Sequence, residues 1–185
     1  MSVLPLTAWE NFYIIIGSSA GALTGLMFVV ITLIAGRRQD ETSWAIGAFD
    51  TPIVVHLGVV LFLAALLSAP WSALEPVAIL LGFTGLGGMA YVAIVMRRMR
   101  RRVAYEMVRE DWLWFALLPF AGYITLLVAS LLLPSSPDAA LFIVGAVLLL
   151  LVMVGLRNAW DAITFLVTER GPQLRERDED RVGPD

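Results

Sequence analysis

A single histidine and one short polar segment hold the side chains with the most scope for chemistry. His56 is the only histidine among 185 residues, and an imidazole titrates near neutral pH when nothing perturbs it. Arg157 and Asp161 interrupt a long apolar run and stand at i and i+4, where they can pair on one helix face. Asn158 lies between them, and Asp50 closely precedes the stretch that contains His56. These five residues are the candidate polar site.

Two interpretations of this candidate polar site stay open. In the first, it is a binding or gating site at one mouth of a helix bundle. If the helices that carry His56 and Asn158 are neighbours, Asn158 can bond the imidazole while Arg157 holds Asp161. In the second, the polar segment is an interfacial anchor, and His56 bonds to the backbone of a neighbouring helix. No nucleophile lies at the same depth, so neither interpretation predicts catalysis.

A serine-hydrolase string, Gly17-Ser18-Ser19-Ala20-Gly21, also occurs. The G-x-S-x-G motif works as a strained turn between a strand and a helix, whereas here it lies inside an uninterrupted apolar stretch. At a rise of about 1.5 Å per residue, Ser19 and His56 differ in depth by roughly 15 Å, which excludes a catalytic pair. The chain has no cysteine, and one histidine cannot build a closed metal or haem site within one chain. We expect no enzyme activity, no metal and no cofactor.

The elements that must position these residues are membrane helices. Apolar residues make up 59% of the chain and the mean hydropathy is +0.81, well above the usual composition of a soluble domain. The small net charge of −3 carries no nucleic-acid signal. Stretches of about 20 apolar residues can cross a bilayer as helices, and open sheets cannot. The sequence therefore predicts an all-α, polytopic membrane protein built as a bundle of about five transmembrane helices, at 12–35, 53–69, 77–96, 113–133 and 139–157.

Arginine placement predicts the orientation of these five spans. All 13 basic residues are arginines, and they alternate strictly between consecutive loops. The loops that follow the first and third spans and the segment after the fifth span carry arginines, while the turns 70–76 and 134–138 carry none. By the positive-inside rule the N-terminus is outside and the C-terminus is cytoplasmic. We expect residues 1–170 to form the transmembrane domain, with the fifth helix extending to about 168, and 171–185 to be a disordered cytoplasmic tail.

The first span carries small residues that suit close helix packing. Gly17, Gly21 and Gly25 recur every four residues, and a neighbouring stripe recurs every seven residues through Asn11, Ser18, Gly25 and Thr32. Small residues let helix backbones approach where lipid supplies no hydrophobic drive for association. Three roles stay open: a contact within the chain, a homo-oligomer seam, or the lining of a pore. The glycine-rich third span is the expected partner within the chain.

Helix starts and one helix break are also predicted. Thr7 to Glu10 and Ser72 to Glu75 match the capping box, and Ser136 precedes a proline suited to the first position of a helix. Pro119 predicts a kink in the fourth span.

The strings 9–13, 17–25 and 157–161 resemble those of small bacterial integral membrane proteins to which no activity is attached. The resemblance implies a bacterial cytoplasmic membrane and transfers no site residues. We expect a non-catalytic structural, accessory or assembly component of the bacterial inner membrane. Its partners would be the lipid bilayer, a second copy through the first span, or another membrane protein. The alternative is a small transport or channel protein that acts as a homo-oligomer, with the candidate polar site at its cytoplasmic mouth.

Overall fold

The computed structural model describes residues 5–35, 51–101 and 112–168, and these segments are helical with short turns and no strand. The all-α prediction is confirmed. The elements are the 3-10 helix η1 (Pro5–Trp9), α1 (Glu10–Ala35), α3 (Thr51–Leu67), α4 (Glu75–Arg101), the π-helix η3 (Leu113–Leu117), α6 (Leu118–Leu132) and α7 (Pro137–Thr168). Asp50 and the tail 171–185 lie outside the described residues.

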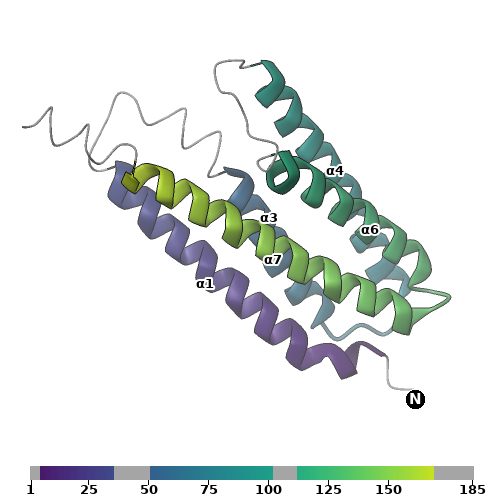
Figure 1. Cartoon of the computed structure of the whole chain (residues 1–185). Coiled ribbons are helices and arrows are strands. Elements are labelled where there is room, and N and C mark those ends of the chain that lie inside the picture. Colours follow the sequence, from purple (N-terminus) through teal and green to yellow (C-terminus); the bar gives the residue numbers. More distant parts are fainter. Residues whose placement is uncertain (1–4, 36–50, 102–111, 169–185) are drawn as a thin grey trace, which may run out of the picture.

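The helices lie side by side in a bundle whose centre is formed by α3 and α7 (Figure 1). The helix α1 packs against α3 and α7, while α4 packs chiefly against α6. The helix α6 joins the two groups through its contact with α7. We call the end where α3 begins and α4 and α7 end the arginine end, because Arg97, Arg98 and Arg157 lie toward it.

Four of the described helices are long and apolar enough to span a membrane. They cover Pro5–Val30, Glu75–Arg98, Leu113–Leu132 and Pro137–Asp161. The apolar part of α3, Pro52–Leu67, is shorter. At about 1.5 Å per residue, the 17 residues of α3 reach roughly 25 Å, the lower limit for crossing a hydrocarbon core. These lengths and compositions fit a membrane-embedded protein.

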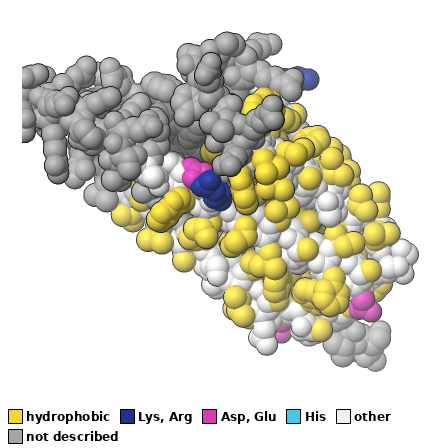
Figure 2. Space-filling view, viewed as in Figure 1, with side chains coloured by type: hydrophobic (Ala, Val, Ile, Leu, Met, Phe, Trp, Pro, Cys, Tyr) yellow, Lys and Arg dark blue, Asp and Glu magenta, His cyan; other side chains and the backbone are white. Residues whose placement is uncertain are grey.

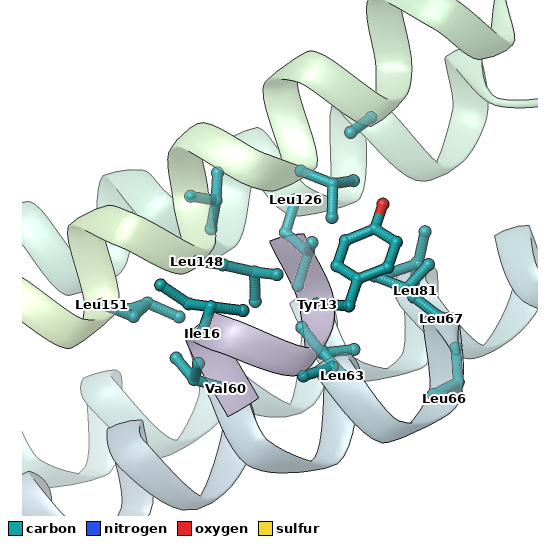
Figure 3. Close-up of a cluster of buried hydrophobic side chains, with 14 of the residues drawn as sticks. Tyr13, Ile16, Val60, Leu63, Leu66, Leu67, Leu81, Leu126, Leu148 and Leu151 are labelled. Atoms are coloured by element: carbon teal, nitrogen blue, oxygen red, sulfur yellow. The ribbon is translucent and has the colours of Figure 1, made fainter. Parts of the chain in front are cut away.

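Many large hydrophobic side chains are exposed on the outer surface of the bundle. Phe83, Leu131 and Phe142 are at least two-thirds exposed. Figure 2 shows hydrophobic side chains over the visible face, with charged side chains near its ends. In water such a surface would promote aggregation, whereas lipid tails match it. The interior is packed with leucine and valine, and Tyr13 of α1 lies among Leu63, Leu67, Leu81 and Leu126 (Figure 3).

The predicted capping box at Ser72 is wrong, and the predicted proline start of α7 is confirmed. The 3-10 helix runs directly into α1, so Thr7 lies inside a helical turn. The carbonyl of Leu74 accepts the Ala78 N–H at 2.9 Å, so Leu74 takes the cap position assigned to Ser72. A capping match fixes a helix start only to within a turn, because helical geometry can extend past it. The helix α7 begins at Pro137, and the Ser136 carbonyl accepts the Ala140 N–H at 3.0 Å.

Candidate functional site

His56 lies one turn into α3, where it is 1% exposed and faces two tyrosines. Its Nδ1 lies 2.8 Å from the hydroxyl of Tyr123 of α6, a hydrogen bond whose donor depends on the imidazole tautomer. The ring of Tyr91 of α4 stands edge-on to the imidazole, with centroids 6.1 Å apart. Three helices therefore meet at one buried polar group, which we call the His56–Tyr123 pair.

Close approach of α4 to α6 makes this arrangement possible. A Cβ at Gly88 of α4 would overlap the Tyr123 ring, and one at Gly85 would lie 3.1 Å from the Tyr123 carbonyl. Glycine at these positions lets the ring lie close against the α4 backbone, and the Tyr123 hydroxyl reaches His56. The expected pairing of the glycine-rich third span with the first span is wrong, because these α4 glycines pack on α6.

The candidate polar site is only partly assembled in the structure. Arg157 and Asp161 form the predicted ion pair, with side chains 39% and 35% exposed. The helices α3 and α7 are neighbours, but the predicted hydrogen bond between Asn158 and His56 is wrong. The imidazole Nδ1 bonds to Tyr123 instead, because α6 brings a hydroxyl to it. Asp50 lies beyond the described part of the chain.

Sequence reasoning missed Tyr91 and Tyr123. Both occur inside apolar runs, where an aromatic residue is ordinarily a packing residue. The only sequence signal was the glycine pair Gly85 and Gly88, spaced to leave room for a large neighbour, and the sequence alone does not name that neighbour.

Three buried side chains in the described segments have polar atoms without a hydrogen-bond partner. These side chains are Tyr13 and Tyr91, each with an unpaired hydroxyl, and Asn158, whose amide nitrogen and oxygen are both unpaired. Asn158 is 0% exposed, so it is fully withdrawn from solvent and lipid. An unpaired amide in apolar surroundings costs roughly 1–3 kcal/mol on protein scales. Asn158 is therefore the least satisfied side chain of the described interior.

The chemistry available at the His56–Tyr123 pair is proton holding and hydrogen bonding. The pair can exchange a proton between Nδ1 and the hydroxyl oxygen, or bind a small hydrogen-bonding guest. Within the described ranges no group of three His, Cys, Asp or Glu side chains is placed to hold a metal ion.

The small-residue face of α1 divides into two parts. Gly17 packs on α3 so closely that a Cβ there would lie 2.8 Å from the Ala64 Cβ, and Gly21 faces Leu61 at 3.8 Å. Gly25 has no neighbour within 4 Å of such a Cβ and is exposed. The ridge thus makes a contact within the chain over its first half. The stripe through Asn11, Ser18, Gly25 and Thr32 faces outward.

An apolar groove of about 180 Å³ lies between α1, α3 and α7 toward the arginine end. Gly155 and Ala159 line it on α7, and Leu23 and Met27 line it on α1. It contains almost no polar surface, so it is suited to hydrocarbon only.

Comparison of the chain with protein-family models, with curated proteins and with solved structures finds no match.

Proposed function

We propose that this chain is a five-span protein of the bacterial cytoplasmic membrane that serves as a non-catalytic structural, accessory or assembly component. Its N-terminus is outside and its C-terminus is cytoplasmic. The arginine alternation supports this orientation, and the helix lengths support the insertion. In this proposal the short helix α3 is the second of the five spans, and α1, α4 and α7 pack around it.

One observation carries the proposed role: the outward face of α1 is built as a helix-association seam. Seven of its residues alternate at spacings of four and three, and all are exposed: Asn11, Ile15, Ser18, Ala22, Gly25, Val29 and Thr32. This spacing follows the seam of a left-handed helix pair, and small residues fill its middle. The same stripe on a second copy is self-complementary, as a two-fold interface requires. The partner we propose is therefore a second copy of this chain.

Cysteine cross-linking in the membrane tests this seam, because the chain contains no cysteine of its own. We expect Ser18→Cys to give a disulfide-linked dimer under mild oxidation. Ser19→Cys is the matched control, since it is equally exposed but about 100° around the helix. The second control is Ala90→Cys, at an exposed position on α4. Equal cross-linking at all three positions, or none at Ser18, would contradict the seam.

The His56–Tyr123 pair favours a second candidate function, a small transport or channel protein with a polar site at the cytoplasmic mouth. Buried ionisable groups in membrane helices commonly mark ion or proton paths. Proteoliposomes under a potassium diffusion potential, read with a pH-sensitive dye, test this candidate. The transport candidate requires that the wild-type protein conduct protons. It also requires that His56→Phe abolish this flux without lowering the melting temperature. Wild-type flux no greater than that of empty liposomes would remove the candidate.

A further inference from the structure

Asn158 requires a partner that the described side chains do not supply. Its amide can donate two hydrogen bonds and accept two, yet neither its nitrogen nor its oxygen has a partner, at 0% exposure. His56, the partner expected from the sequence, bonds to Tyr123. Polar groups this deeply buried are almost always satisfied, either by protein or by an ordered water.

The register of the helices places Asn158 beside the π-helix. The helices α6 and α7 run antiparallel, and a Cβ at Gly122 of α6 would lie 3.8 Å from Leu151 of α7. Asn158 follows Leu151 by about two turns on the same face, and η3 precedes Gly122 by about the same distance. The helix α7 also packs directly against η3. Asn158 therefore lies at the level of the π turn.

The π turn and Pro119 together leave backbone carbonyls at this level without their usual helical donors. The N–H of Leu118 donates to the carbonyl of Leu113, in the wider i to i+5 pattern. Pro119 has no N–H to donate. The Trp114 carbonyl consequently loses both helical donors, the one from Leu118 and the one from the proline position. In a membrane helix, a carbonyl freed by proline must find another donor.

We propose that Asn158 and the π turn together hold one buried water molecule. The water donates one hydrogen bond to the Trp114 carbonyl and bonds the Asn158 amide with its remaining capacity. Water is the ligand that fits, because it donates and accepts at once and satisfies an orphan amide and an orphan carbonyl together. This site is independent of the α1 seam and of the transport candidate.

The sign of one stability change tests the site. Asn158→Leu keeps the side-chain volume roughly constant and removes the amide. If the water is held, N158L also strands the Trp114 carbonyl, and we expect the melting temperature in detergent to fall by several degrees. If the amide is unpaired and no water is bound, N158L removes the free-energy cost of burying that amide, and the melting temperature rises. A rise overturns the proposal.

A double-mutant cycle with Pro119→Ala connects the effect to the freed carbonyl. P119A restores an N–H at that position, so the N158L change should cost less in the P119A background than in the wild-type background. Equal costs in the two backgrounds would show that Asn158 does not act on this carbonyl.

Radiolytic hydroxyl-radical labelling separates a bound water from a direct bond between the amide and the carbonyl. Radicals form at bound waters, so buried Phe115 in the π turn should be oxidised in the wild type and protected in N158L. P119A, which keeps Asn158, should also lower Phe115 oxidation and serves if N158L fails to fold. Protection of Phe115 in the wild type would overturn the water.

Discussion

Replacement of Gly88 by alanine tests how the His56–Tyr123 pair is positioned. The added methyl group would overlap the Tyr123 ring, which is 0% exposed. Overpacking of this kind costs about 1–3 kcal/mol, and an alanine in a helix returns about 0.5–1 kcal/mol relative to glycine. If the ring moves, the His56 hydrogen bond breaks and leaves buried groups unpaired, which costs about 1–3 kcal/mol more. We expect Gly88→Ala to lower the free energy of unfolding by about 3 kcal/mol, within a range of about 1–5 kcal/mol.

Gly87 is the matched control for this substitution. It is the preceding residue of the same helix, and a Cβ there would have no neighbour within 4 Å. Gly87→Ala should therefore be neutral or stabilising by at most about 1 kcal/mol. The assay is reversible unfolding in mixed micelles of a mild detergent and dodecyl sulfate, followed by tryptophan fluorescence. Equal effects of the two substitutions would refute the argument that α4 is held against the Tyr123 ring.

Four further substitutions probe other positions of the bundle. Tyr13→Phe should raise the free energy of unfolding by about 1 kcal/mol, because it removes a buried hydroxyl that has no partner; a loss of stability in the same micelle assay would show that the hydroxyl is bonded. Gly17→Ala should destabilise by about 1–2 kcal/mol because α1 and α3 touch there, whereas Gly25→Ala should leave the unfolding of the monomer unchanged or slightly stabilised. Asp161→Asn should cost less than about 1 kcal/mol, since its ion pair with Arg157 is more than a third exposed; a larger loss would indicate a structural anchor.

The helices were predictable from the sequence because lipid imposes a simple rule. A stretch that crosses a bilayer must be apolar, helical and of a set length, and charged residues collect at its ends. Each predicted stretch therefore contains a helix in the structure. The ends differ by a few residues, because a 3-10 turn precedes α1 and charged residues continue α4 past the apolar core, whereas the extension of the last helix to about 168 was predicted.

Helix partners were less predictable, because every lipid-exposed face and every buried face is apolar. The small residues of the first and third spans suggested that these two spans pack together, but glycine marks only a close approach and not the helix that approaches. The structure assigns Gly17 to α3, and Gly85 and Gly88 to α6.

Only the part of the candidate site that lies within a single helix was predictable from the sequence. The pair of Arg157 and Asp161 follows from i, i+4 spacing on one helix, and it is present. The partner of His56 depends on which helix faces α3 at that depth, and that helix proved to be α6 with Tyr123. Pro119 signalled a break in the fourth span, and the structure shows the form it takes, a π turn at Leu113–Leu117.

Topology mapping tests the central claim most directly. A chain with five spans has its two ends on opposite sides of the membrane, whereas a chain with four or six spans has them on the same side. Reporter fusions after Arg38, Arg102 and Asp185 should show cytoplasmic activity, and a fusion after Ser135 should show external activity. The fusions after Arg38 and Arg102 decide between five spans and four, since the short helix α3 and the long helix α4 lie between them. Opposite sides for Ser135 and Asp185, with Arg38 and Arg102 both cytoplasmic, are the result we predict. Opposite sides for Arg38 and Arg102, or the same side for Ser135 and Asp185, would contradict the five-span membrane fold.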